Sequence, residues 1–201
     1  MKTLVIDTAT RACSVALFEG EDCVASSYEV IGRGHAERLL PVIAALPQKG
    51  RANQIAVNIG PGSFTGIRVG VAAARALAFA WGGSCSGYNC LGLVAAMATR
   101  THAIDVVMAG GHGEYFFQQF AADGTAISDP VSLSPQIAIS QSKAELVAGD
   151  VASAFVAARG FGTAIELLPD ARSWQLISAQ SDLPANPFYG RPPDAKPAIG
   201  K

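Results

Sequence analysis

Short runs of apolar residues, each bounded by polar or glycine-containing segments, predict four strands in the first part of the chain. They lie at residues 2–7, 13–19, 23–30 and 55–59. Within the second run, Ser14, Ala16 and Phe18 alternate with Val15 and Leu17. This alternation has the two-residue period of a strand.

Two stretches carry apolar residues at helical spacing instead. Residues 35–46 predict a helix, and Pro41 inside it should either produce a kink or mark a helix that begins nearer to it. Residues 63–81 predict a longer helix, and the glycine pair that follows predicts its end. The predicted order of elements is therefore strand, strand, strand, helix, strand, helix.

The longer helix lacks the broad polar face of an ordinary surface helix. Its narrow polar stripe consists of Arg68, Ala72, Arg75 and Phe79, and its other faces are small and apolar. Such a helix is buried on most sides. Two interpretations stay open: a helix that lies wholly within the core, or one that rests on a sheet and meets a second protein on another side.

The second half of the sequence predicts a further lobe, entered through a helix-like stretch at residues 90–99. Residues 135–148 predict a helix that begins after Ser134, and residues 155–158 predict a short strand. Three longer strands are predicted at residues 104–109, 114–121 and 126–133. An extended tail is predicted from the prolines Pro184, Pro187, Pro192, Pro193 and Pro197.

Composition narrows the class of protein. Half of the 201 residues are hydrophobic and 15% are charged, against about 25% charged in an ordinary soluble domain. This apolar excess often marks a partner surface. The net charge of −1 gives no global nucleic-acid footprint. The sequence shows no internal repeat, and we expect two lobes, residues 1–100 and 101–201.

We find neither a signal peptide nor a membrane span in the sequence. The N-terminal apolar run is too short for a signal peptide, and no run approaches the ~20 apolar residues of a membrane span. The four cysteines fit neither a zinc site nor a disulfide framework. We therefore expect a cytoplasmic protein with free thiols and no membrane partner.

The clearest chemical signal is the segment GPGSFTGIR, residues 60–68, between the fourth strand and the long helix. Glycine-rich turns at helix N-termini bind anions through backbone N–H groups. The spacing fits neither a P-loop nor a dinucleotide fingerprint, and residues 38–104 contain no Asp or Glu to hold a metal ion. A tight structural turn and a residual nucleotide loop both stay open. The latter would use Asp7, Thr8, Gly60, Gly62, Ser63, Thr65 and Gly66.

Asp7 ends the first strand, where actin-like ATPases place an acid beside phosphate and metal, but it could equally cap the turn. The three histidines, His35, His102 and His112, have no metal-ligand spacing. No set of nucleophile, base and orienting residue stands out. The sequence predicts neither a catalytic residue nor a metal site.

Several segments together resemble the bacterial TsaB (YeaZ) family. They are LVIDTAT at residues 4–10, CSVAL at 13–17, HAERLLP at 35–41, GPGSFTGIRVG at 60–70 and YGRPPDAKP at 189–197. The resemblance is strong over residues 1–82 and again at the end. The chain departs from the family pattern at residues 109–115 and in a somewhat short second lobe.

This resemblance implies an α/β fold, a degenerate form of the two-lobed actin-like ATPase (ASKHA, ribonuclease H-like) architecture. It implies a noncatalytic subunit that binds and activates TsaD, with TsaE, for threonylcarbamoyl transfer to adenosine 37 of ANN-decoding tRNAs. ATP or ADP and a metal are expected only in the partner complex, with none bound by the isolated chain. Contact with tRNA is expected through the complex, and the isolated chain could form a homodimer.

The resemblance places the partner surface on the two helices of the first lobe. Apolar burial would supply most of the affinity, and arginines would orient the partner. The expected residues are His35, Arg38, Leu39, Val42, Ile67, Arg68, Gly70, Val71, Ala74, Arg75 and Ala78. Two other functions stay open: a small ATPase or kinase that uses Asp7 and the 60–66 loop, and a metallopeptidase.

Overall fold

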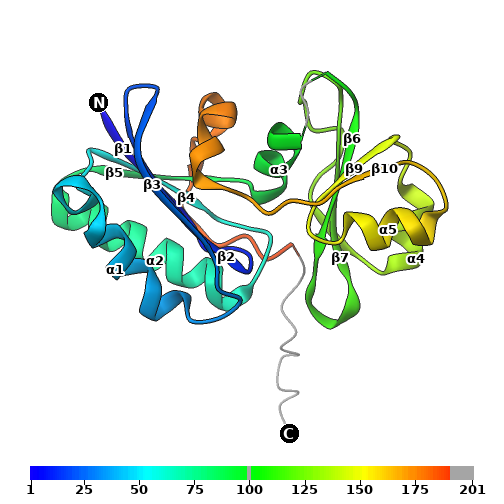
Figure 1. Cartoon of the computed structure of the whole chain (residues 1–201), viewed down its shortest axis with the longest axis horizontal. Coiled ribbons are helices and arrows are strands. Elements are labelled where there is room, and N and C mark those ends of the chain that lie inside the picture. The colour runs from blue at the N-terminus through cyan, green and yellow to red at the C-terminus, as the bar shows by residue number, and fades with distance from the viewer. Residues whose placement is uncertain (99–100, 191–201) are drawn as a thin grey trace, which may run out of the picture.

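The computed structural model describes residues 1–98 and 101–190, and it contains two sheets that lie side by side (Figure 1). The first lobe has a six-stranded sheet in the order β11-β5-β4-β1-β2-β3. The first three strands form an antiparallel meander, and β4 and β5 run parallel to β1. The strands are β1 (Lys2–Asp7), β2 (Ala12–Glu19), β3 (Asp22–Val30), β4 (Gln54–Asn58), β5 (Ser84–Tyr88) and β11 (Leu183–Pro184).

Helices cover both faces of this sheet (Figure 1). Val15 and Leu17 of β2 pack in the cluster that includes α1 and α2, while Ala16 and Phe18 pack in the cluster that includes η3. The strand predicted at residues 13–19 is confirmed, and its alternating residues lie on the two covered faces of the sheet. The helices are α1 (His35–Ala45), η1 (Pro47–Gly50), α2 (Phe64–Trp81) and η3 (Ala171–Gln180).

The second lobe repeats the topology of the first. Its sheet has the order β10-β9-β6-β7-β8. These strands correspond in order to β5-β4-β1-β2-β3 of the first sheet. The shared topology leaves no repeat in the sequence, because different apolar residues can fill equivalent strand positions. The elements are β6 (Ile104–Ala109), η2 (Gly111–Gly113), β7 (Tyr115–Phe120), β8 (Val131–Leu133), α4 (Pro135–Gln141), β9 (Leu146–Ala148), α5 (Ala152–Arg159) and β10 (Thr163–Ile165).

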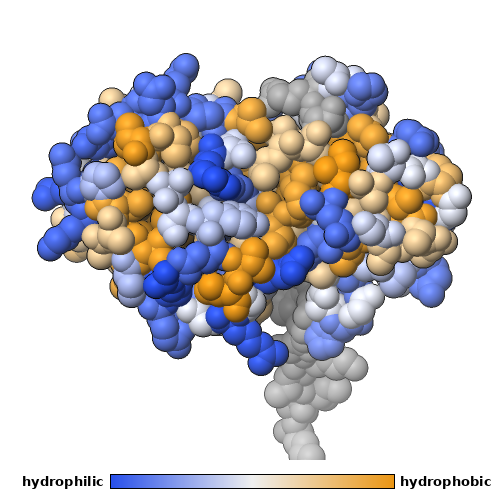
Figure 2. All heavy atoms as spheres, viewed as in Figure 1, coloured by the Kyte–Doolittle hydropathy of each residue, from blue (hydrophilic) through white to orange (hydrophobic). Residues whose placement is uncertain are grey.

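Helix α3 (Cys90–Ala98) joins the two lobes and belongs to both cores. Its Leu93 packs with Phe18 and Trp174 in the first lobe, whereas Leu91 and Val94 pack in the core of the second. A helix that is apolar around its whole circumference must be buried on several sides. Apolar residues also gather on the surface where the lobes meet (Figure 2).

Three predictions for the second half were wrong. Residues 135–148 divide into α4 and β9, because the buried Asp105 carboxylate accepts hydrogen bonds from the backbone N–H groups of Lys143 (2.9 Å) and Ala144 (3.1 Å) and so ends the helical run. Residues 155–158 lie inside α5, whose Phe155 is buried against the sheet, and the strand predicted at 126–133 shrinks to β8.

Other boundaries also differ. Strand β5 was not predicted, whereas the helix predicted at residues 35–46 is confirmed as α1, which begins at His35 and continues through Pro41 to Ala45. The chain also returns to the first lobe after the second, since η3 and β11 pack there, in contrast to the expected division at residue 100. The predicted tail prolines Pro192, Pro193 and Pro197, and Thr99 of the predicted 90–99 helix, lie outside the described residues.

Helix α2 lies unusually close to the end of β1. The Thr8 hydroxyl donates a 2.7 Å hydrogen bond to the Gly66 carbonyl oxygen. A Cβ atom at Gly66 would lie 2.0 Å from the Thr8 carbonyl oxygen, and one at Gly70 would lie 2.4 Å from Thr8 Oγ1. Both glycines therefore allow a backbone approach that any side chain would prevent.

By length and hydropathy α2 would also suit a membrane span, and 33% of it is buried inside the chain. The expectation that this helix is buried on most sides is wrong, because one side packs on the sheet and the opposite side is exposed. Its Gly66, Ile67, Gly70, Val71, Ala74 and Ala78 are buried.

Substitution of Gly66 by alanine should lower the free energy of unfolding by at least about 2 kcal/mol, because the new methyl group overlaps a backbone oxygen. Gly92→Ala, in α3, is the matched control, since the nearest atom to its Cβ would be 3.9 Å away. That change should raise stability by up to about 1 kcal/mol through helix propensity. Urea unfolding of both variants measures the difference, and equal effects would contradict this account of the packing.

Candidate functional site

The Asp7 carboxyl group is fully buried where three strands of the first sheet end. Its Oδ2 accepts hydrogen bonds from Asn58 Nδ2 of β4 (2.7 Å) and from the Tyr88 hydroxyl of β5 (3.0 Å). Its Oδ1 accepts one from the Ala9 backbone N–H (3.3 Å). Burial raises the pKa of Asp7 to about 6, and the hydrogen bonds from Asn58 and Tyr88 limit the rise. The carboxyl group joins the ends of β1, β4 and β5.

The glycine-rich loop packs against the turn that follows β1. The Ser63 N–H donates to the Ala9 carbonyl oxygen (2.7 Å), and the Gly60 N–H donates to Asn58 Oδ1 (2.8 Å). A Cβ atom at Gly62 would lie 2.1 Å from the Ala9 oxygen. These N–H groups bind the chain itself, so the loop has the geometry of a structural turn, one of the two interpretations that the sequence left open.

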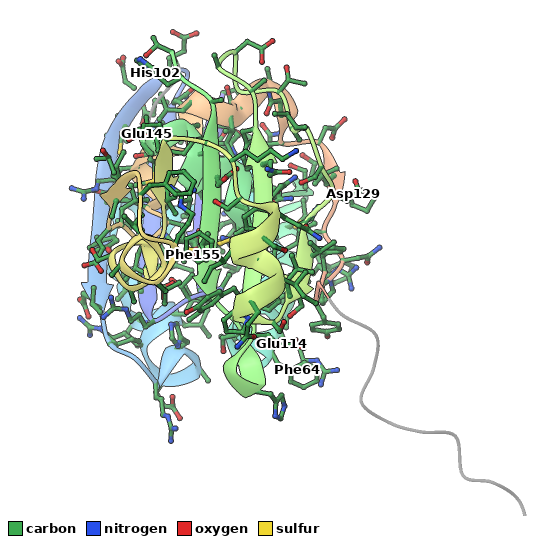
Figure 3. The ribbon with its side chains drawn as sticks, turned by 90° about the vertical axis from the view of Figure 1, so that its right-hand side faces the viewer. Phe64, His102, Glu114, Asp129, Glu145 and Phe155 are labelled. Carbon is green, nitrogen blue, oxygen red and sulfur yellow. The ribbon has the colours of Figure 1, made fainter. Side chains whose placement is uncertain are left out.

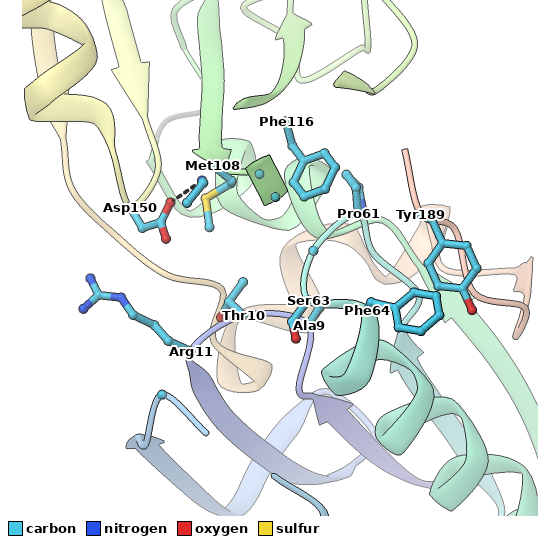
Figure 4. A pocket seen from close by; sticks show the side chains of 15 residues that line it. Ala9, Thr10, Arg11, Pro61, Ser63, Phe64, Met108, Phe116, Asp150 and Tyr189 are labelled. Carbon is cyan, nitrogen blue, oxygen red and sulfur yellow. Dashed lines mark hydrogen bonds between the residues drawn. The ribbon is translucent and has the colours of Figure 1, made fainter. Parts of the chain in front are cut away.

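A cleft of about 400 Å³ lies between the lobes, beside this loop (Figure 4). Arg11 lines it from the first lobe and Asp150 from the second, with Phe64 and Phe116 among the apolar residues. Asp150 Oδ1 accepts a 2.8 Å hydrogen bond from the Ala109 N–H, and burial raises the pKa of Asp150. Asp7 does not line the cleft. The structure therefore brings the predicted loop residues and Asp7 together but separates the Asp7 carboxyl from the open space beside them.

The segment that departs from the family pattern, residues 109–115, forms a short 3₁₀ turn between β6 and β7. His112 in this turn is exposed, with a φ of 59°. His102 lies at the opposite end of the molecule from Phe64 and Glu114 (Figure 3). Within residues 1–98 and 101–190, no group of three or more His, Cys, Asp or Glu is placed to hold a metal ion.

The expected partner residues divide into two sets. Three of them, Arg38, Arg68 and Arg75, are exposed. The other eight are buried inside the chain: His35, Leu39, Val42, Ile67, Gly70, Val71, Ala74 and Ala78. These eight lie on the apolar stripes that pack against the chain's own sheet, so in the isolated chain their side chains are covered. Whether the two helices bind a partner stays a prediction.

The outward faces of the same helices carry different residues. The polar stripe predicted for α2 is exposed throughout, and Phe79 on it is 91% accessible to solvent. On α1, Leu40 is 53% exposed. Sequence periodicity separates the two faces of such helices, but it does not indicate which face the sheet covers.

Two residues of the C-terminal segment were missed by residue-based reasoning. The Arg68 Nε donates a 2.8 Å hydrogen bond to the Tyr189 hydroxyl, and Arg75 Nη2 donates to Asn186 Oδ1. The only sequence signal for this contact was the family-like segment that begins at Tyr189. Both arginines expected to orient a partner are thus held by the chain itself.

The buried Asp7 carboxyl should make stability depend on pH. Because its folded-state pKa of about 6 exceeds the ordinary value of 3.8, its contribution is fully present below pH 4 and is lost as the pH rises through 6. The shift corresponds to a loss on the order of 3 kcal/mol. Asp7→Asn removes this titration, so the unfolding free energy of the natural chain minus that of the variant should fall between pH 4 and pH 7. Chemical denaturation at several pH values measures it, and a difference that does not change would refute the assignment.

Residues 27–139 match the family model described as TsaD, tRNA N6-adenosine threonylcarbamoyltransferase. The tRNA threonylcarbamoyladenosine biosynthesis protein TsaB of Escherichia coli (strain K12) is 35% identical over 135 residues, which cover 63% of this chain and 58% of that protein. TsaB of Haemophilus influenzae is 44% identical over 82 residues, 38% of this chain and 34% of that protein.

A solved structure of YeaZ from Pseudomonas aeruginosa shares the fold, with a TM-score of 0.77 and 25% identity over 94% of this chain and 99% of that one. The matched segments span less than two thirds of the curated relatives described above. The expected fold class, a two-lobed α/β fold of ASKHA type, is confirmed. Because the family model covers more than half of the sequence and the TsaB and YeaZ proteins match it as well, the chain belongs to the TsaB (YeaZ) family.

Proposed function

We propose that this chain is a noncatalytic partner subunit that binds and activates a TsaD-type transferase, together with TsaE, in threonylcarbamoyl transfer to adenosine 37 of tRNA. Membership of the TsaB family supports a role in tRNA threonylcarbamoyladenosine biosynthesis. The observation that carries the finer proposal is the internal use of Asp7 and of the glycine-rich loop. The Asp7 carboxyl and the Gly60 N–H, which could otherwise contact a nucleotide, form hydrogen bonds that hold strands and turns together.

The outer faces of α1 and α2 support the docking part of the proposal. Phe79 projects from α2 almost fully exposed, and burial of one such ring is worth about 1.5–3 kcal/mol. Exposed aromatic and arginine side chains on one helix are typical of the residues that dominate binding energy. The α2 stripe, which we define as Phe64, Arg68, Ala72, Arg75 and Phe79, presents both kinds.

A small ATPase is the alternative, and the cleft beside the 60–66 loop is the observation in its favour. It would require the isolated chain to bind magnesium–ATP. The burial of Asp7 speaks against it, since a metal ligand must reach the ion.

A reconstituted assay tests the proposed function. Modification of tRNA by the cognate TsaD and TsaE, supplied with threonylcarbamoyl-adenylate, should require this chain, and this chain alone should give no product. Modification that proceeds equally well without it would overturn the proposal. In that case, isothermal titration of the isolated chain with magnesium–ATP becomes the next measurement.

Substitution of Phe79 by aspartate should weaken binding to TsaD at least tenfold, because a carboxylate would replace the most exposed apolar ring of the α2 stripe. Ile127→Asp is the control, since Ile127 is 63% exposed but lies in the second lobe. Surface plasmon resonance of both variants compares them, with circular dichroism to verify folding. Equal loss in both, or in neither, would exclude the outer face of α2 as the contact.

A further inference from the structure

The last described residues form a strap, residues 185–190, that lies along the start of α2. Its Phe188 N–H donates a 2.8 Å hydrogen bond to the Ile59 carbonyl oxygen, and Ala185 is buried in the first-lobe core. Gly60 lies beneath it with a φ of +107°, and a Cβ atom there would be 2.3 Å from the Phe188 carbonyl oxygen. Backbone contacts therefore hold the strap in place at Gly60 and Ile59.

Two strap side chains then hold the two arginines of the α2 stripe. The Arg68 guanidinium donates to the Tyr189 hydroxyl and lies 3.7 Å from the centre of the Phe64 ring. The Phe64 and Tyr189 rings are 5.0 Å apart, so the guanidinium is confined between an aromatic face and a hydroxyl group. Asn186 Oδ1 accepts from Arg75 in the same way, two helical turns further along.

Both acceptors are neutral, which leaves the charge of each arginine uncompensated. The sequence contains no Asp or Glu between Glu37 and Asp105. Among the residues that the structure describes, neither Arg68 nor Arg75 forms an ion pair. Each guanidinium has five N–H donors, of which the strap engages one at each arginine.

We propose that the strap positions Arg68 and Arg75 to bind carboxylates on a helix of the partner that packs on the α2 stripe. The inference rests on the proposed function and adds the chemistry of the contact. Seven residues of helix separate the arginines by about 10 Å, so carboxylates two turns apart on the partner would match them. Asn186 and Tyr189 are positioning residues, because they lower the side-chain entropy that each arginine loses on binding.

The charge pattern favours a partner with carboxylates over a second copy of this chain. A two-fold dimer through the same stripe would oppose two arginines with two more, and α2 carries no carboxylate to pair with them. It also favours a protein over RNA, since the stripe has two cations on an otherwise apolar face and the chain has a net charge of −1.

Asn186→Asp provides the sharpest test. It keeps the shape of the acceptor but pairs Arg75 with a carboxylate inside the chain, which neutralises the charge offered to the partner. Binding of the full chain to TsaD should weaken about tenfold, as for Arg75→Ala, while the melting temperature of the isolated chain does not fall. Both variants should also reduce the salt dependence of binding. Unchanged affinity in Asn186→Asp would overturn the proposal.

Tyr189→Phe tests the other contact with the ring retained. It should weaken binding about threefold to tenfold in the natural chain and have no further effect in an Arg68→Ala background, because the hydroxyl acts through Arg68. An equal effect in both backgrounds would overturn the positioning role.

The controls separate the two proposals. If the natural chain does not bind TsaD at all, the proposed function fails first. If it binds and these four variants bind equally well, only the role of the strap fails. Weakened binding of these variants to tRNA with unchanged binding to TsaD would also overturn the proposal.

Discussion

The fold depends on a direct contact between two backbone turns, the one after β1 and the glycine-rich loop before α2. Carbonyl oxygens of Thr8 and Ala9 occupy the space where side chains at residues 62 and 66 would otherwise project. This contact sets how close α2 lies to the sheet, and so which of its faces is buried. It also holds Gly60 in the conformation over which the last segment of the chain passes.

The same contact explains how a ligand-like motif becomes a structural joint. A helix N-terminus after a glycine-rich turn is suited to an anion, and Asp7 stands where a metal ligand would stand. In this chain a serine hydroxyl caps the helix, and an asparagine and a tyrosine complete the hydrogen bonds of the carboxyl group. The buried acid costs stability near neutral pH, and its hydrogen bonds across three strand ends offset part of that cost.

Much of the first lobe could be predicted from the sequence, because its strands and helices carry strong local periodicity. The alternation of β2 and the end of α2 at Gly82 are examples. Tertiary contacts decided the rest. The carboxylate of Asp105, which lies in β6, binds the backbone just after α4 and so ends that helix. The two arginines of the α2 stripe form hydrogen bonds with residues more than one hundred positions away in the sequence. Eight residues expected on the partner surface are buried inside the chain for a related reason: periodicity identifies an apolar face, but not whether a sheet or a second protein covers it.

Helix α3 has a consequence for motion. Two-lobed folds of this class can close around a ligand by a hinge between the lobes, which requires that the connecting elements slide or bend. Here the connector has its side chains interleaved with both cores, with Leu93 in one and Leu91 and Val94 in the other. Separation of the lobes would bring one of these apolar faces into water. The packing of α3 therefore opposes a hinge motion between the lobes, because opening them would separate the connector from one of its two cores.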